Sequence, residues 1–379
     1  MSCFYNPVKL KWGPEITKDL PEIITASDLN MKNVLILTGS KSLKKSGKLD
    51  IILKSLNDRR IFVCDGVPSN PEISELCGFK SETDKLNYDS IIAIGGGSVI
   101  DMGKCLAAFK NLQINGYSTL KRGIINKRHQ NNSIDIPIVA IPTTAGTGSE
   151  VTSWATIWDK ENNKKYSIES ERLYPKIAII DPTLTMDLPL QLTVSTALDA
   201  LSHALEAYWS KRTNEIVRMY ALMAIELIIK NLNNLIDNLN DLNLRTKIAQ
   251  ASLYAGLAFS NTKTTACHSI SYPLTSKYNI PHGIATSMTL ANFFNINKES
   301  IIDKDALLSA FDVEEISQIK NKINNIFLKS KIPFKLRDYN IKEEDFDSII
   351  KRSFTPDRMN NNPVEVTREL LREVLKDIY

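Results

Sequence analysis

The sequence predicts an α/β domain built on a parallel β-sheet, followed by an all-α domain. Its 379 residues are enough for two domains at about 100–200 residues each. Thirteen of the 15 glycines precede residue 150, which indicates many strand-to-helix turns in the first half and long helices in the second. Short β-branched runs alternate with helical stretches only before residue 182, and such alternation is typical of a parallel sheet.

Five short runs of mainly Ile and Val, bounded by Gly, Pro, Asp or Asn, predict the strands of this sheet. They span residues 34–38, 61–63, 91–94, 136–141 and 177–180. Later in the chain apolar residues recur at helical spacing without a strand, and long helices are expected over 193–210, 214–239 and 244–260. We therefore expect the α/β domain over residues 1–185 and the α-helical domain over residues 186–379.

The composition excludes several classes of protein. Hydrophobic residues make up 43% and charged residues 24%, as in globular proteins and unlike disordered chains. The net charge of +4 fits an anionic small-molecule substrate, and no basic stripe points to a nucleic acid. Neither a secretory signal nor a run of about 18 apolar residues is found, so no membrane contact is expected. Five cysteines without a C-x-x-C pair indicate a cytoplasmic protein, for which a homodimer or larger homo-oligomer is expected.

A glycine-rich turn connects a predicted strand to a predicted helix. The predicted strand 90–94 is followed directly by Gly95, Gly96, Gly97 and Ser98, and the predicted helix 99–108 begins after this turn. Backbone N–H groups of such a turn, together with the helix dipole, can hold a pyrophosphate. Asp101 in the first helical turn would support the loop. The alternative is a tight turn that binds nothing.

A second polar turn follows the strand 136–141. Its hydroxyl side chains include Thr143, Thr144 and Thr147. Such hydroxyls suit contact with a ribose, a phosphate or a nicotinamide amide. Both turns lie at the carboxyl ends of strands, where open α/β sheets bind ligands. The second turn could instead serve only as a helix cap.

The end of the strand 34–38 bears on the choice between NAD and NADP. An acidic residue commonly stands at such a place and bonds the ribose 2′-hydroxyl of NAD. This sequence has Gly39 there, followed by Ser40, Lys41 and Ser42, which could accept a 2′-phosphate. We therefore expect NADPH to be slightly preferred, with NADH also accepted. The alternative is an ordinary strand–helix turn.

The histidines indicate a metal site. Asp199 and His203 lie four residues apart in a predicted helix, so they share one face. His268 and His282 follow in the helical half. One carboxylate and three imidazoles without thiolates suit one Fe(II) or Zn(II) ion. Each histidine alone could be structural, and the fourth, His129, stands among charged residues and is expected to be solvated.

In this order and spacing, the motifs resemble those of the iron-containing (group III) alcohol dehydrogenases over essentially the whole chain. The resemblance implies a Rossmann-like N-terminal domain and a helical C-terminal domain, as in dehydroquinate synthase-like folds. It also implies an enzyme that uses NAD(P)H and one divalent metal. The residues that match the family's metal ligands are Asp199, His203, His268 and His282. Those that match its cofactor contacts are Gly96, Gly97, Ser98, Asp101, Thr143, Thr144, Thr147 and Lys165.

Two positions depart from the common family pattern. Many members have a histidine beside the nicotinamide four residues after the third ligand, where this chain has Tyr272, so we expect Tyr272 to take part in proton transfer instead. In relatives, the residue four before the Asn of an Asn-Pro pair lies near the substrate pocket. Here that residue is Arg358, whose guanidinium can hold an oxyanion. Arg358 could alternatively be a surface arginine.

Phrases at residues 152–159 and 271–275 are similar to a branch of the family that includes phosphonoacetaldehyde and sulfoacetaldehyde reductases. The resemblance implies metal-dependent, NAD(P)H-linked reduction of a two-carbon aldehyde with an anionic head to a primary alcohol. Sulfoacetaldehyde would give isethionate, and phosphonoacetaldehyde would give 2-hydroxyethylphosphonate. Three alternatives stay open: a general short-chain alcohol dehydrogenase, a dehydroquinate-synthase-type lyase, and a non-catalytic nucleotide-binding protein.

Overall fold

The chain forms two compact units. The computed structural model describes residues 3–39, 42–114, 116–133, 135–162 and 164–379. The α/β unit comprises Asn6–Thr144 and Ser149–Asp187, and the helical unit comprises the described part of Met1–Tyr5, Ala145–Gly148 and Leu188–Tyr379. No helix in these described ranges is long and apolar enough to cross a membrane.

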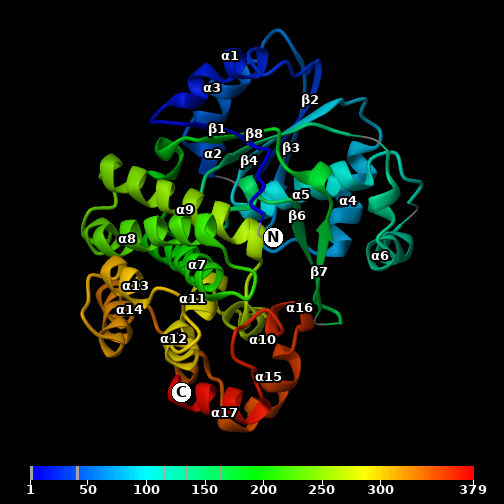
Figure 1. Cartoon of the computed structure of the whole chain (residues 1–379). Coiled ribbons are helices and arrows are strands. Elements are labelled where there is room, and N and C mark those ends of the chain that lie inside the picture. Colours follow the sequence, from blue (N-terminus) through cyan, green and yellow to red (C-terminus); the bar gives the residue numbers. More distant parts are fainter. Residues whose placement is uncertain (1–2, 40–41, 115, 134, 163) are drawn as a thin grey trace. The chain divides into compact units, whose positions relative to one another are not determined.

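The α/β unit is built on a six-stranded sheet in which every adjacent pair of strands is parallel. The strand order is β1-β8-β5-β4-β2-β3. Figure 1 shows this sheet in the blue-to-green part of the chain. The bounds are β1 Lys9–Trp12, β2 Asn33–Gly39, β3 Arg60–Val67, β4 Ser90–Gly95, β5 Ile138–Pro142 and β8 Ile177–Ile180. All five predicted strands are therefore present and belong to one parallel sheet. The apolar runs of β2, β4, β5 and β8 are buried on both faces, whereas β3 is an edge strand that is only partly buried.

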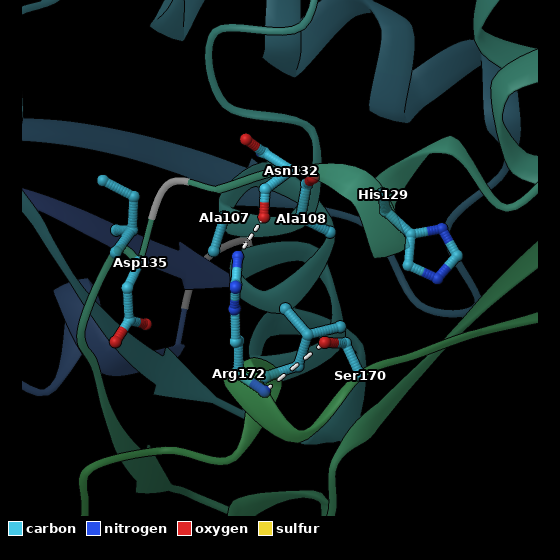
Figure 2. A pocket seen from close by; sticks show the side chains of 9 residues that line it. Ala107, Ala108, His129, Asn132, Asp135, Ser170 and Arg172 are labelled. Atoms are coloured by element: carbon cyan, nitrogen blue, oxygen red, sulfur yellow. Dashed lines mark hydrogen bonds between the residues drawn. The ribbon is translucent and has the colours of Figure 1, made fainter.

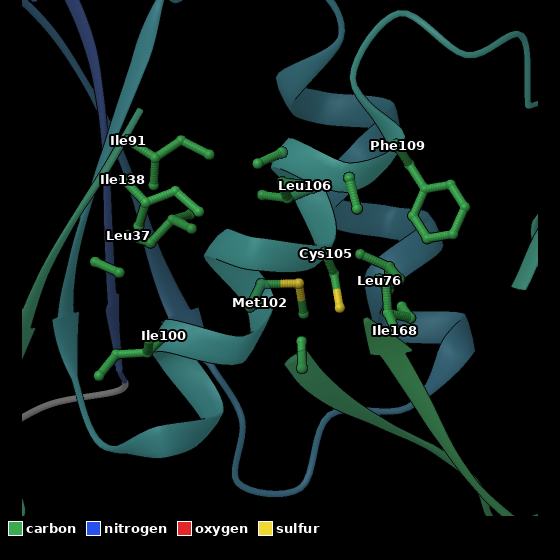
Figure 3. Close-up of a cluster of buried hydrophobic side chains, with 14 of the residues drawn as sticks. Leu37, Leu76, Ile91, Ile100, Met102, Cys105, Leu106, Phe109, Ile138 and Ile168 are labelled. Carbon is green, nitrogen blue, oxygen red and sulfur yellow. The ribbon is translucent and has the colours of Figure 1, made fainter. Parts of the chain in front are cut away.

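Helices cover both faces of this sheet. They are α1 Leu20–Thr25, α2 Ser42–Lys45, α3 Lys48–Ser55, α4 Ile73–Thr83, α5 Gly97–Phe109 and α6 Tyr117–Ile125. Alternate residues of one strand point to opposite faces, so Ile36 of β2 packs with α1 and α3, whereas Leu37 packs with α4 and α5. Figure 3 shows the cluster between the sheet and helices α4 and α5, in which Leu106 of α5 points toward Ile91 of the sheet and Met102 lies beside Cys105.

The sequence pattern did not predict three of the strands that the structure describes. Strand β1 is an edge strand of alternating lysines and apolar residues and is largely exposed, so it lacks the apolar run of a buried strand. Strands β6 (Trp154–Asp159) and β7 (Lys164–Glu169) pair antiparallel in a separate two-stranded sheet. In β7 polar residues alternate with apolar ones, so no continuous run of Ile and Val reveals it.

The helical unit contains no strand in residues 188–379, all of which are described. Its helices are α7 Leu190–Trp209, α8 Glu215–Asp237, α9 Leu242–Thr262, α10 Ala266–Tyr278, α11 His282–Ser287, α12 Leu290–Asn297, α13 Lys304–Ala310, α14 Ile316–Ser330, α15 Phe346–Ser353, α16 Pro356–Met359 and α17 Arg368–Asp377. The three predicted long helices correspond to α7, α8 and α9. The predicted fold class, a parallel-sheet α/β domain followed by an all-α domain, is confirmed.

Ala145–Gly148 belongs to the helical unit although it follows strand β5. Gly148 has a φ of +61°, and a Cβ there would lie 2.6 Å from Cα of Gly256 on α9. A Cβ on Gly146 would lie 2.3 Å from the carbonyl oxygen of Thr196 on α7. These two glycines therefore let the backbone lie directly against α7 and α9.

Candidate functional site

Four side chains predicted to bind metal come from three helices of the helical unit. Asp199 and His203 lie on α7, His268 lies on α10, and His282 is the first residue of α11. The Nε2 atoms of His268, His203 and His282 lie 3.5, 3.9 and 4.0 Å from Oδ1 of Asp199. The structure therefore brings together the whole predicted set around one carboxylate oxygen.

These separations suit one metal ion. Ligand atoms about 2.0–2.1 Å from a tetrahedral ion stand roughly 3.4 Å apart. One ligand atom each from Asp199, His268 and His282 lies within 4.8 Å of the others. His203 stands beside this trio, with its ring stacked on Phe259 and on His268 at centroid distances of 4.0 and 4.5 Å. Among the described residues, neither Oδ1 of Asp199 nor Nε2 of His268 has a hydrogen-bond partner, and a cation would satisfy both.

The second ring nitrogen of each histidine contacts another polar group. Nδ1 of His203 lies 3.2 Å from the carbonyl oxygen of Gly146. Nδ1 of His268 contacts Oε2 of Glu206, and Nδ1 of His282 lies 3.4 Å from Oγ of Ser271. If each Nδ1 carries the proton, the lone pair of each Nε2 is left for a metal.

Burial and neighbouring charges shift the pKa values of the predicted metal ligands. Burial alone would raise the pKa of Asp199, but the neighbouring imidazoles outweigh it and hold that pKa below its usual range. Burial lowers the pKa of His203 to about 4, so this ring is neutral at neutral pH. Burial opposes a charge on His268, yet the Glu206 carboxylate raises the pKa of His268 to about 9. A metal ion must therefore displace a proton from His268.

A glycine sets the spacing between α11 and α7. A Cβ on Gly283 would lie 1.8 Å from the carbonyl oxygen of Ser195 and 3.0 Å from Cβ of Asp199. Any side chain at this position would push the two helices apart. The residue after His282 thus allows that histidine to approach Asp199.

The predicted phosphate-binding turn has the expected local structure in the α/β unit. Strand β4 ends at Gly95, and α5 begins at Gly97, with Gly96 as its N-cap residue. A Cβ on Gly95 would lie 2.4 Å from Cγ2 of Val99, so strand and helix approach too closely for a side chain there. Oγ of Ser98 accepts a hydrogen bond from the backbone N–H of Asn70 at 3.0 Å. The first N–H groups of an α-helix lack carbonyl partners one turn earlier, so the start of this 13-residue helix is suited to bind an anion.

The second predicted turn lies beside the first. The N–H of Thr143 donates to the carbonyl oxygen of Gly95 at 3.0 Å, and a Cβ on Gly96 would lie 3.4 Å from Cγ2 of Thr144. Thr143 and Thr144 therefore lie with the glycine turn at the carboxyl ends of the neighbouring strands β4 and β5. Thr147, expected with them, belongs to the helical unit.

Asp101, which was expected to support the glycine turn, contacts residues that follow the second turn. Its carboxylate accepts hydrogen bonds from Oγ of Ser149 and, at 2.8 Å, from the N–H of Thr156. Lys104, one turn further along α5, is fully buried and donates to the carbonyl oxygens of Ser149, Thr152 and Trp154 at 2.6, 2.7 and 2.9 Å. This network ties residues 149–156 to the helix that begins at the glycine turn.

Two other predicted cofactor residues lie on β7 and at the end of β2. Lys165 lies on β7, with Nζ 5.6 Å from the ring centroid of Trp158. Gly39 ends β2, and a Cβ there would meet only Cγ2 of Val99 at 3.6 Å and a carbonyl oxygen at 4.0 Å, so the site tolerates a side chain. Ser40 and Lys41 lie outside the described residues.

The predicted substrate and proton-transfer residues lie in the helical unit. The Tyr272 ring on α10 is nearly parallel to that of His282, with centroids 6.3 Å apart. Arg358 is half-buried on the short helix α16. Oγ of Ser269 on α10 donates to the carbonyl oxygen of Ser353 and accepts from the N–H of Thr355, so the start of α16 is tied to α10.

The prediction that His129 is solvated is wrong. Its side chain lines a small pocket together with Asn132 and Arg172 (Figure 2). The residue is only 5% exposed, and its Nε2 lies 3.2 Å from the carbonyl oxygen of Glu169. The ring packs edge-on against Phe109, at the end of α5. Charged neighbours in sequence therefore did not determine its surroundings.

Glu206 is the site residue that the sequence reasoning missed. It lies on α7, is fully buried, and contacts His268 directly. The spacing in the sequence could have revealed this residue. Asp199, His203 and Glu206 stand at positions i, i+4 and i+7, so they share one face of the helix.

Comparison with known proteins gives a consistent result along the chain. A family model described as iron-containing alcohol dehydrogenase matches residues 7–182, and one described as the C-terminal part of the Fe-containing alcohol dehydrogenase family matches residues 193–379. Alcohol dehydrogenase 4 of Schizosaccharomyces pombe (strain 972 / ATCC 24843) is 30% identical over 383 residues, covering 99% of this chain and 89% of the relative. The 1,3-propanediol dehydrogenase of Citrobacter freundii is 31% identical over 366 residues, covering 93% and 92%.

A solved structure is similar over the full length. The crystal structure of sulfoacetaldehyde reductase from Bifidobacterium kashiwanohense in complex with NAD+ has a TM-score of 0.88 and 28% sequence identity. The similarity covers 100% of this chain and 98% of that one.

The fold, the glycine turn and the carboxylate–imidazole cluster define an oxidoreductase of the metal-dependent alcohol dehydrogenase class. The chain belongs to the iron-containing alcohol dehydrogenase family. Members of this family use NAD(P)H and a divalent metal, and the residues described above fit both groups.

Proposed function

We propose that this chain reduces a small aldehyde with an anionic head to a primary alcohol, using NAD(P)H and one divalent ion. Sulfoacetaldehyde and phosphonoacetaldehyde are the candidate substrates. The observation that carries the redox part is the convergence of three imidazoles on the buried carboxylate of Asp199. This ligand set suits Fe(II) and Zn(II) alike.

Arg358 supports the proposal that the substrate carries an anionic head. The helix that carries it is tied through Ser269 to α10, and α10 also carries His268 and Tyr272. A half-buried guanidinium holds two oxygens of a sulfonate or phosphonate more strongly than a solvated one, because less water competes. The similarity to a sulfoacetaldehyde reductase favours the same substrate class.

The mechanism assigns separate tasks to the two units. When bound, the ion polarises the carbonyl oxygen as a Lewis acid, and the reduced nicotinamide supplies the hydride. Asp199 and the three imidazoles would hold the ion. The N–H groups at the start of α5 would hold the cofactor pyrophosphate. Reduction of the carbonyl also adds one proton to its oxygen, and Tyr272, whose ring centroid lies 6.3 Å from that of His282, would hold that proton on its phenolic oxygen.

The cofactor preference is also part of the proposal. Gly39 provides no carboxylate to repel a 2′-phosphate, and a Cβ at this position would make only ordinary van der Waals contacts. We expect NADPH to be used slightly better than NADH for this reason. Assembly as a homodimer or larger homo-oligomer, and a location in the cytoplasm, stay predictions.

A neutral short-chain alcohol or aldehyde is the second candidate substrate. The similarity to a 1,3-propanediol dehydrogenase favours it. A dehydroquinate-synthase-type lyase is less favoured, because the family match to alcohol dehydrogenases extends over both units.

A substrate screen tests the proposal. NADH and NADPH oxidation would be followed with sulfoacetaldehyde, phosphonoacetaldehyde, propanal and 3-hydroxypropanal, with Fe(II) and Zn(II) supplied separately. We expect the highest kcat/KM with one of the two anionic aldehydes. Higher kcat/KM with the neutral aldehydes would assign the chain to the general alcohol dehydrogenases, and no oxidation with any of them would refute the redox function.

A further inference from the structure

We infer that Glu206 is a positioning residue that fixes the proton of His268 on Nδ1 and so keeps Nε2 available to a metal ion. The inference rests on the proposed metal site. It concerns a residue that is not itself one of the four ligands. Its basis is the set of hydrogen bonds that surrounds the buried Glu206 carboxylate.

One oxygen of Glu206 is held by the beginning of α10. Oε1 accepts from Oγ1 of Thr265 at 2.7 Å and from the N–H groups of Cys267 and His268 at 2.8 and 3.3 Å. The direction of the Thr265 hydroxyl is also set, since Oγ1 of Thr265 accepts from Nε1 of Trp209 at 3.1 Å. These donors fix the carboxylate in one orientation.

The other oxygen, Oε2, contacts Nδ1 of His268. A carboxylate only accepts hydrogen bonds, so Nδ1 of His268 must carry a proton. The opposite ring nitrogen, Nε2, then faces Oδ1 of Asp199 at 3.5 Å with a lone pair available once its own proton has left. A carboxylate behind a ligating histidine is a recurrent feature of metal sites, where it fixes the tautomer and the ring orientation.

The Glu206→Gln variant would reverse the direction of the hydrogen bond between residue 206 and Nδ1 of His268, with little change in side-chain volume. The N–H groups of Cys267 and His268 require an oxygen at the Oε1 position, so the amide NH₂ of glutamine must face Nδ1 of His268. The ring would then accept at Nδ1 and carry its proton on Nε2, where it blocks a metal. We expect roughly 10–100-fold weaker metal binding, as found for mutations of such outer partners.

Thr265→Val is the matched control. It removes a hydroxyl that touches the same carboxylate but leaves the contact between Glu206 and His268. Glu206→Asp is the conservative variant, because it keeps a carboxylate that can only accept from the ring. If Glu206 merely anchored the beginning of α10, Gln would serve as well as Glu, and Thr265→Val would be at least as harmful.

The test is titration of the metal-free proteins with Co(II), followed by visible absorption, with the melting temperature of each metal-free protein measured in parallel. We expect Thr265→Val to keep the wild-type Co(II) spectrum and nearly the wild-type affinity, Glu206→Asp to bind with intermediate affinity, and Glu206→Gln to bind most weakly with an altered spectrum. Equal affinity in wild type and Glu206→Gln, or equal loss in the Gln and Val variants, would overturn the inference while the metal site stands.

Two further outcomes are decisive. If wild-type protein binds no Co(II), the proposed function and this inference both fail. If Glu206→Gln does not fold, Glu206→Asp is compared with Thr265→Val. Weaker binding by the Asp variant then supports the inference, and binding equal to that of the Val variant overturns it.

Discussion

Nε2 of His268 and Oδ1 of Asp199, from helices α10 and α7, face each other at 3.5 Å. Both residues are buried, and neither atom has a hydrogen-bond partner in the part of the chain that the structure describes. Buried polar atoms are normally satisfied, so this pair marks the point at which a bound cation has the most to contribute.

Gly283→Ala should weaken metal binding and destabilise the fold. Its Cβ would overlap the carbonyl oxygen of Ser195 at 1.8 Å, so α11 must move away from α7 and carry His282 from Asp199. Overpacking of this kind costs about 1–3 kcal/mol or more. Thermal unfolding and metal titration measure the two effects. Gly123→Ala is the control, since its Cβ would meet no atom closer than 3.7 Å. A Gly283→Ala protein with unchanged metal affinity would show that this close contact is unimportant to the site.

Gly39→Asp should shift the cofactor preference from NADPH toward NADH. The new carboxylate can bond the ribose 2′-hydroxyl and repel a 2′-phosphate, and the Cβ that carries it would make only ordinary van der Waals contacts. One charge-assisted hydrogen bond of about 1.5–3 kcal/mol corresponds to roughly 10–100-fold in the ratio of kcat/KM values. Gly39→Asn has the same size without the charge and should change the ratio much less. A strong NADH preference in the wild-type enzyme would refute the proposed selectivity.

Arg358→Ala should reduce activity on anionic aldehydes selectively. Removing one side of a desolvated charge pair costs about 2–5 kcal/mol, so kcat/KM for sulfoacetaldehyde or phosphonoacetaldehyde should fall at least roughly 30-fold. Activity on propanal should change little. Arg352→Ala, on the exposed surface of α15, is the matched control and should leave both activities intact. Equal losses on charged and neutral aldehydes would mean that Arg358 has a structural role.

Glu150→Gln should stabilise the protein increasingly as the pH rises. Glu150 is 3% exposed, and burial raises its pKa to about 7 from a usual 4.5. The folded protein therefore keeps a proton that the unfolded chain releases. The stability linked to this proton is fully present below pH 4.5 and is lost as the pH rises through 7.

Melting temperatures between pH 4.5 and 7.5 check this pH prediction. The advantage of Glu150→Gln over wild type should grow across that range, by up to about 3 kcal/mol. The same change at the exposed Glu373 should give no trend. Parallel curves for wild type and Glu150→Gln would show that Glu150 is ionised in the folded protein at all these pH values.

Features carried by local pattern were predictable from the sequence. The buried strands appear as apolar runs, and Asp199 and His203 appear as an i, i+4 pair in a chain with only four histidines. Features that depend on distant contacts were not. The exposed edge strand β1 has no apolar run, and His129 is buried because Phe109 packs against it. Likewise, nothing near Gly283 in the sequence reveals that it touches Ser195.

The metal content of the purified protein tests the central assignment most directly. Wild-type protein, grown with iron or zinc, should carry one divalent ion per chain. His268→Ala should lose most of this metal and nearly all turnover while keeping its fold, as judged by circular dichroism. His129→Gln, which changes the histidine outside the cluster, should keep the ion. A folded His268→Ala protein that retained a full equivalent of metal and normal turnover would show that Asp199, His203, His268 and His282 are not the metal site.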